Sequence, residues 1–196
     1  MYIDIHTHIH SEEAYLQYRK RTRGRVERAI LMHWFRRPLV EALTFVKNHH
    51  MLRLAVTVDP FKNLAGQLKN IETLFKTEST VVGMKLYPGY QPISTDDKRV
   101  IAMAQLCAEY NKPFTIHGGD VYDPHQRGYQ LAYSHPLAID TLAVAVPECP
   151  IVIAHFGFPY FLETANVVNK NANVYTDISG TITASKTKIG DARLVK

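Results

Sequence analysis

Short β-branched runs alternate with longer amphipathic runs along the chain, and this alternation constrains the fold more than any other feature. Helical candidates lie between the runs, for example at 63–76, where apolar residues recur at helical spacing. Parallel strands need long crossover connections, which are usually helices, so the pattern predicts an α/β fold with a parallel sheet. The seven candidate strands are residues 2–8, 28–34, 53–59, 81–88, 113–119, 150–157 and 173–180.

An open doubly wound sheet and a (β/α) barrel both satisfy this pattern. The polar side chains of the strands favour the barrel, because they gather near the C-terminal ends, where (β/α) barrels build their active sites. We therefore predict a (β/α) TIM-like barrel with seven recognisable βα units, in a single domain over residues 1–196. No eighth β-branched run is found before Lys196, so we expect the eighth strand to be missing and the barrel to be C-terminally incomplete in this chain.

Composition excludes several classes of protein. The chain is 46% hydrophobic and 21% charged, as in ordinary globular proteins, and has no apolar run of about 20 residues and no secretory signal. Cys107 and Cys149 are isolated, which argues against a disulfide framework and for a cytoplasmic location. We interpret the basic stretch at 18–28 as a solvated helix and its exit turn. The expected partner is a small-molecule substrate, with no nucleic acid and no membrane, and a homo-oligomer is left open.

The opening residues MYIDIHTH place two histidines at the end of an apolar strand. Because side chains alternate between the faces of a strand, Asp4, His6 and His8 are predicted to share one face, and Ile3 and Ile5 to pack against helices on the other. Histidines at positions i and i+2 of a strand converge on one point, so His6 and His8 form a good bidentate metal clamp.

Later strands repeat this partition of polar and apolar side chains. Lys85, Tyr87, His117, His155 and Asp177 all lie near the C-terminal ends of their strands and are predicted to face the same axis. Several imidazoles and a lysine are costly in a dry core unless a ligand satisfies them. The pattern therefore predicts a metal site.

The ordered motifs resemble the amidohydrolase superfamily, in particular its branch of small metal-dependent hydrolases with a TIM-barrel fold. DIHTHI resembles the opening H-x-H strand of the family, GMKLYPGY its fourth-strand lysine motif, TIHGG its fifth-strand histidine and IAHFGFP its sixth-strand Ala-His-x-Gly. NVYTDISG resembles the seventh-strand segment. Each motif is weak alone, but the ordered set is specific and covers nearly the whole chain.

The resemblance implies one or two divalent ions, most often zinc, with His6, His8 and His117 as ligands of the principal ion. His155 would bind a second ion or polarise the substrate. Lys85 would be either carbamylated between two ions or, as we favour, a cation that pairs with a substrate carboxylate. A counterpart to the family's eighth-strand aspartate is not recognisable, because Asp191 lies in a polar, Lys-rich stretch.

We also have expectations for residues close to the predicted metal ligands. Asp177 is expected to fix a neighbour by hydrogen bonds rather than to replace the missing base, and Tyr87 to shape the substrate pocket. His10, His33 and His125 are the other histidines expected to approach a substrate. The helix over 94–110 opens with a Ser-x-x-Asp capping pattern at Ser94.

The predicted activity is metal-dependent hydrolysis, in which metal-activated water attacks an amide, ester or lactone of a small molecule. One alternative is a non-oxidative, metal-dependent decarboxylase of the same branch. Two others are a histidinol-phosphatase-like phosphoesterase and a non-catalytic metal-binding barrel.

Overall fold

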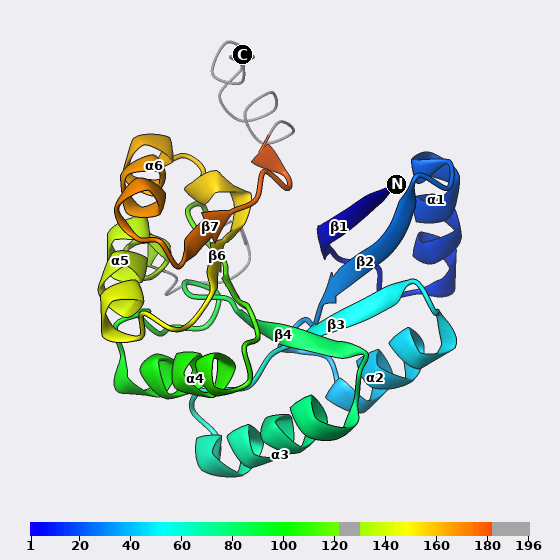
Figure 1. The fold of residues 1–196 in the computed structure, drawn as a ribbon, viewed down its shortest axis with the longest axis horizontal. Helices are drawn as coiled ribbons and strands as arrows, with labels where there is room; N and C mark the ends of the chain where they lie inside the picture. The colour runs from blue at the N-terminus through cyan, green and yellow to red at the C-terminus, as the bar shows by residue number, and fades with distance from the viewer. Residues whose placement is uncertain (122–129, 182–196) are drawn as a thin grey trace. The chain divides into compact units, whose positions relative to one another are not determined.

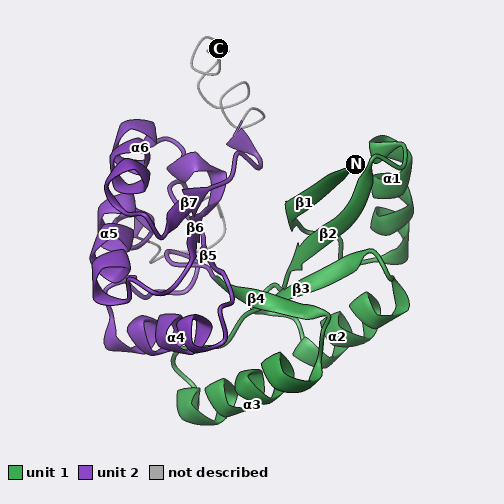
Figure 2. Cartoon of the chain, viewed as in Figure 1, with its two compact units in different colours: residues 1–85 green, residues 86–196 purple. Residues whose placement is uncertain are grey.

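The structure, a computed structural model, describes residues 1–121 and 130–181 of the chain. The chain divides into two compact units, Met1–Lys85 (unit 1) and Leu86–Lys196 (unit 2), which Figure 2 shows in separate colours. The prediction of a single domain over residues 1–196 remains a prediction.

Unit 1 is a series of four parallel strands with helices between them. The strands are hydrogen-bonded in chain order, and the helices lie along one face of them (Figure 1). Its elements are β1 (Tyr2–Thr7), α1 (Glu12–Thr22), β2 (Val26–Met32), α2 (Leu39–Asn48), β3 (Leu52–Val56), α3 (Leu64–Thr77) and β4 (Val81–Leu86), of which Leu86 belongs to unit 2.

Unit 2 repeats the arrangement with three parallel strands, also in chain order. Helices α4, α5 and α6 lie on one side of these strands (Figure 1). The elements are α4 (Lys98–Glu109), β5 (Phe114–Ile116), the 3₁₀ turn η1 (Leu131–Ser134), α5 (Pro136–Ala145), β6 (Ile151–Ile153), the 3₁₀ turn η2 (Ala154–Gly157), α6 (Phe161–Lys170) and β7 (Val174–Thr176).

Strand side chains and the inner helix faces form the core of each unit. In unit 1, Leu31, Leu54 and Val81 are fully buried, and in unit 2 Phe114 and Ile151 are fully buried. Burying one such side chain contributes roughly 1.5–3 kcal/mol relative to leaving it exposed. The apolar strand runs thus explain why both units fold as sheets covered by helices.

The seven predicted strands are confirmed among the described residues, together with their parallel order. The unit 2 strands are shorter than predicted, at three residues each. The polar residues that were predicted to form the site therefore lie just after the last residue of each of these strands. They belong to turns, whose conformation cannot be predicted from the alternation of side chains along a strand. Within the described residues, 1–121 and 130–181, none of the helices is long and apolar enough to cross a membrane.

Strand β1 departs from the strict alternation that its sequence predicts. Its register against β2 shifts between Asp4 and Thr7, where three steps on β1 match two on β2. Ile3 and Ile5, expected to pack against helices, are 63% and 43% exposed. Register shifts of this kind, one of which also lies between Tyr2 and Ile3, change the direction of side chains locally.

The predicted cap of α4 is wrong by three residues. Asp97, not Ser94, is the N-cap, and its carboxylate accepts from the backbone N–H of Arg99 at 2.8 Å. Arg99 also donates to both carboxylate oxygens through its guanidinium, which lowers the pKa of Asp97 to about 2. An acid that accepts both backbone and charged donors is the stronger cap, and it displaces the serine.

Candidate metal centre

The two histidines of the opening motif converge at the end of β1. His6 is 7% exposed and His8 is exposed, and their Nε2 atoms lie 3.3 Å apart. Two imidazole nitrogens on one tetrahedral zinc are separated by about 3.3 Å, given a Zn–N bond of about 2.05 Å. The pair, called the histidine clamp below, has a spacing that matches two zinc ligands and that also lies within hydrogen-bond distance.

Asp4 holds the backbone of the clamp. One carboxylate oxygen accepts from the His6 backbone N–H at 3.1 Å, and the other accepts from the Tyr18 hydroxyl of α1 at 2.8 Å. Burial, followed by the contact with Asp4, raises the pKa of Tyr18, so its hydroxyl stays protonated as a donor. The bulged end of β1 is thereby fixed to the first helix.

Lys85 lies near the end of β4 and is 1% exposed. Its backbone carbonyl is within 2.8 Å of the Thr57 hydroxyl, which also lies 3.0 Å from the carbonyl of His33. Removing an ammonium group from water is expensive, so a buried lysine at a strand end is a candidate for a functional role. In unit 2, Tyr87 is 2% exposed, and burial raises its pKa.

The ring nitrogens of His33 and His49 are engaged in hydrogen bonds within unit 1. The Nδ1 of His33 accepts from the Thr57 backbone N–H at 3.3 Å, and its Nε2 donates to the Arg37 carbonyl at 2.9 Å. The nitrogens of His49 face the Phe45 carbonyl at 2.8 Å and a Glu12 carboxylate oxygen at 2.9 Å. The expectation that His33 approaches a substrate remains a prediction, although both its ring nitrogens are engaged.

His117 follows β5 in unit 2, and the hydrogen bond of its ring defines the tautomer. Its Nε2 lies 2.9 Å from the backbone carbonyl of Asp120. A carbonyl can only accept, so Nε2 carries the proton and Nδ1 carries the lone pair that could bind a metal. The ring also lies 5.0 Å from the ring of His155 and 5.1 Å from the ring of Tyr90, measured between centroids.

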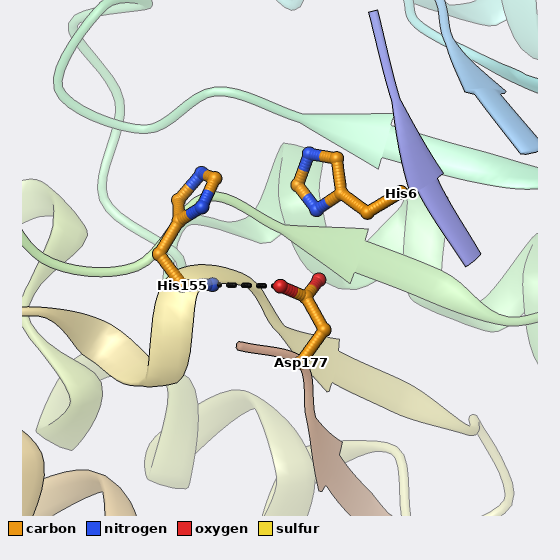
Figure 3. A group of neighbouring side chains, drawn as sticks. All are labelled: His6, His155 and Asp177. Carbon is orange, nitrogen blue, oxygen red and sulfur yellow. Dashed lines mark hydrogen bonds between the residues drawn. The ribbon is translucent and has the colours of Figure 1, made fainter. Parts of the chain in front are cut away.

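His155 is placed by residues at and beyond the end of β7, here called the collar: Asp177, Ser179 and Thr181. Its backbone N–H donates to the Asp177 carboxylate at 3.0 Å, drawn as a dashed line in Figure 3, and Thr181 donates to its carbonyl at 3.0 Å. The ring Nδ1 donates to the Ser179 carbonyl at 2.7 Å, which leaves the lone pair on Nε2.

The backbone at His155 is strained. His155 has φ 63° and Phe156 has φ 48°, both in the left-handed region that side chains rarely adopt. Asp177 accounts for the conformation, because its backbone carbonyl accepts from the Phe156 N–H at 2.6 Å while its carboxylate holds His155. Strain of this kind costs roughly 1–3 kcal/mol per residue and persists only where surrounding contacts enforce it.

Glycines bring the His117 and His155 loops into close contact. A Cβ on Gly119, which has φ 88°, would lie 1.9 Å from the Phe158 carbonyl. The backbone N–H of Asp120 donates to that same carbonyl at 2.6 Å, and the Ser134 hydroxyl donates to the Gly119 carbonyl at 2.6 Å. Only glycine fits, so the backbone beside His117 is tied to the turn that carries His155.

The sequence identified most of these residues but not the contacts that orient them. Thr181 and Gly119 were not singled out, and Ser179 was placed on the same strand face as Asp177 without a role of its own. The motif NVYTDISG contained a signal for Ser179, since a hydroxyl two residues after an aspartate often joins the same turn. His125, expected to approach a substrate, and Asp191 lie outside the described residues.

A parallel α/β fold with imidazoles near the ends of its strands defines a (β/α) protein with candidate metal ligands. The sequence model of the family described as "Amidohydrolase" matches residues 3–193, which is nearly the whole chain. The chain belongs to the amidohydrolase family. Comparison with curated protein sequences finds no match.

Solved structures share the fold at low sequence identity. An uncharacterised TIM-barrel protein from Bordetella bronchiseptica is similar with a TM-score of 0.67 and 16% identity, over 86% of this chain and 59% of that one. The chain thus spans less than two thirds of the length of that protein. The fold class predicted from the sequence, a TIM-like barrel, is confirmed.

Two enzyme structures are also similar. One is described as a probable 2-pyrone-4,6-dicarboxylic acid hydrolase from Acinetobacter baumannii with citric acid bound, at TM-score 0.59 and 13% identity, over 91% of this chain and 70% of that one. The other is a 2,6-dihydroxybenzoate decarboxylase from Rhizobium, at TM-score 0.57 and 12% identity, over 92% of this chain and 74% of that one.

Each unit, taken by itself, offers imidazole donors of the kind that suit a divalent metal ion. In unit 1 the clamp has a nitrogen spacing that matches two ligands of tetrahedral zinc, and in unit 2 carbonyl acceptors fix the tautomers of His117 and His155 so that one ring nitrogen of each is a potential ligand. Metal-binding histidines commonly donate their other N–H to a carbonyl or carboxylate in this way.

Proposed function

We propose that the chain is a metal-dependent hydrolase that cleaves an amide, ester or lactone bond of a small molecule. In this proposal His6, His8, His117 and His155 are the metal-binding residues. The observation that carries it is the 3.3 Å separation of the His6 and His8 Nε2 atoms, a spacing suited to a shared ion and found in a chain of the amidohydrolase family.

A bound divalent ion would polarise a substrate carbonyl and lower the pKa of a coordinated water to about 7. The side chains of the chain would supply the rest. His6 and His8 would hold the ion through Nε2 and His117 through Nδ1, each as a neutral imidazole. His155 presents Nε2 while Ser179 holds its other ring proton, so the neutral ring can bind metal, and it can donate to substrate only after it gains a proton.

Lys85 is proposed to pair with a carboxylate of the substrate. An ammonium group that is 1% exposed interacts strongly with an anion, because little water screens it. The buried Tyr87 is proposed to shape the pocket, and Asp177 to act through the position of His155. A carboxylate-bearing lactone, amide or ester is therefore the substrate class we favour.

Metal removal tests the proposal directly. Purified protein is treated with chelator, reloaded with zinc, and assayed on amides, esters and lactones with and without a carboxylate, while bound metal is counted by mass spectrometry. We expect activity and metal content to fall and return together. The matched control is His50→Ala, an exposed histidine of unit 1 that should leave both unchanged. Activity that is indifferent to chelator would exclude the scheme.

Non-oxidative decarboxylation is the second candidate. It is favoured by the similarity to a decarboxylase and by the buried Lys85, which suits an aromatic carboxylate as well as a hydrolysable one. Release of carbon dioxide from hydroxybenzoate-type acids, with no consumption of water, would select this reaction over hydrolysis.

We further infer a cytoplasmic enzyme that acts without nucleic acid or membrane, with homo-oligomer formation left to be measured. The two cysteines, Cys107 and Cys149, are buried and are not joined in a disulfide, which suits a reducing compartment. Fractionation of cells and light scattering of the purified protein would test location and assembly.

A further inference from the structure

Unit 1 contains a cavity that the metal-binding residues do not use. It has a volume of about 190 Å³ and lies between β2, α2 and the segment that follows β1. A cavity of this size has room for several waters or one small organic molecule. Its lining residues are His10, Leu31, Arg37, Glu41, Ala42 and Phe45.

The walls of the cavity are divided by chemistry. Leu31 is fully buried, Ala42 is 8% exposed, and with Phe45 they make an apolar interior. Arg37 and Glu41 are exposed residues at the start of α2 and bring opposite charges to the same cavity. Neither side chain forms an ion pair within residues 1–121 and 130–181, so the two charges are not neutralised by each other.

We propose that this cavity binds a small zwitterion with an apolar side chain, such as a hydrophobic α-amino acid. The carboxylate of the ligand would pair with the Arg37 guanidinium, its ammonium group with the Glu41 carboxylate, and its side chain would contact Leu31, Ala42 and Phe45. This site is independent of the proposed hydrolytic activity and does not require a bound metal.

The charge arrangement selects this ligand class over simpler ones. A simple anion would be attracted to Arg37 but repelled by Glu41, and a simple cation would meet the reverse situation. A neutral apolar molecule would fill the interior, but the charged groups of Arg37 and Glu41 would then have only water as a hydrogen-bond partner. Only a ligand with both charges and an apolar portion matches all three parts of the wall.

His10 connects the cavity to the histidine clamp. Its ring lines the cavity, and its centroid lies 6.0 Å from that of the His8 ring. A ligand in the cavity would therefore change the environment of a ring next to the clamp. This gives a local signal of occupancy in the NMR spectrum of the His10 side chain.

Binding is tested by calorimetry on the full chain, once with metal and once after chelator, using L-leucine as the probe. We expect a Kd of about 0.1 mM, in the range that so small a ligand can reach. Isovaleric acid lacks the ammonium group and isoamylamine lacks the carboxylate, so each should bind at least about tenfold more weakly. Chelator should not change the affinity for leucine.

Charge-removing variants assign the contacts. Arg37→Gln and Glu41→Gln should each weaken leucine binding at least about tenfold, because each removes a charge-assisted hydrogen bond. The matched controls, Arg25→Gln and Glu27→Gln, change exposed charges at the start of β2 and should bind like the wild type. The proposal is overturned by no binding at about 10 mM leucine, by single-charge analogues that bind equally well, or by unchanged affinity in both cavity variants.

Discussion

The chain positions its histidines in two different ways. The clamp of His6 and His8 depends on a strand, and its geometry comes from the pleat, a bulge and one carboxylate, Asp4. His155 lies in a left-handed turn, and its backbone and ring are held by residues that follow another strand. Spacing along a strand is encoded locally, whereas a strained turn has to be stabilised by residues more than twenty positions away.

The largest effect is expected from the clamp itself. His6→Ala or His8→Ala should weaken zinc binding by more than about 100-fold, above the 10–100-fold loss typical of residues that only orient a ligand. Zinc affinity is measured by competition with a chromophoric chelator, with His50→Ala as the control. Because His6 lies near the end of β1 and His8 directly follows it, we expect both variants to keep the wild-type circular dichroism. If either variant unfolds instead of only losing metal, the proposed difference between the clamp and the turn at His155 is wrong.

Substitutions in the collar should lower the free energy of unfolding more than substitutions in the clamp do. Asp177→Ala removes the acceptor of the His155 backbone N–H and the support of a strained turn, and should lower the free energy of unfolding by about 2–4 kcal/mol. Urea denaturation measures the loss. Asp177→Asn retains an acceptor oxygen and should recover at least half of it. Equal stability of all three proteins would show that the turn does not depend on this side chain.

A substitution at Ser179 distinguishes the orientation of the His155 ring from the stability of the backbone around it. Its hydroxyl donates to Asp177 and lies 3.0 Å from the His155 Nδ1, but its main contact with the ring is through its backbone carbonyl. Ser179→Ala should therefore lower kcat/KM only about 10-fold and shift the pH–rate profile, with less than about 1 kcal/mol of lost stability. A loss of stability with an unchanged pH profile would assign the residue a purely structural role.

Lys85 distinguishes a free cation from a carbamate. If it is a cation, added bicarbonate should leave the activity unchanged, and Lys85→Met should raise the KM for carboxylate substrates about 10-fold more than the KM for neutral ones. Steady-state kinetics with a matched acid and methyl ester provide the measurement. Stimulation by bicarbonate would instead indicate carbamylation.

The smallest effect concerns pH and His33. Burial lowers the pKa of this imidazole, so the folded state keeps it neutral while the unfolded chain binds a proton below about pH 6.5. Stability is therefore fully present above that pH and falls as the pH falls toward the folded pKa. We expect His33→Gln to flatten the pH dependence by about 1 kcal/mol between pH 7 and pH 5 in thermal unfolding. Parallel curves would contradict this.

Much of the fold could be predicted because its signals are local. Strand and helix periodicity identified all seven described strands, and His6 and His8 were recognised from their spacing alone. The bulge in β1 was not predictable in this way, because it depends on the register against β2. The cap of α4 was misplaced because Ser94 and Asp97 both suit the position, and Arg99 decides between them.

The orientation of His155 could not be predicted from the sequence, for a different reason. Its motif places a histidine after a strand, but nothing local indicates a positive φ at His155 and Phe156. That conformation is imposed by Asp177 and Thr181, which are distant in the chain. The sequence could name Asp177 as a residue that fixes a neighbour, but not which atoms it would hold.

The tight approach of Gly119 to Phe158 has a consequence for laboratory evolution. Libraries that aim to change substrate preference should leave Gly119 fixed. The backbone here joins two loops without room for a Cβ atom at this position, so diversity introduced at Gly119 would yield unfolded variants rather than new chemistry.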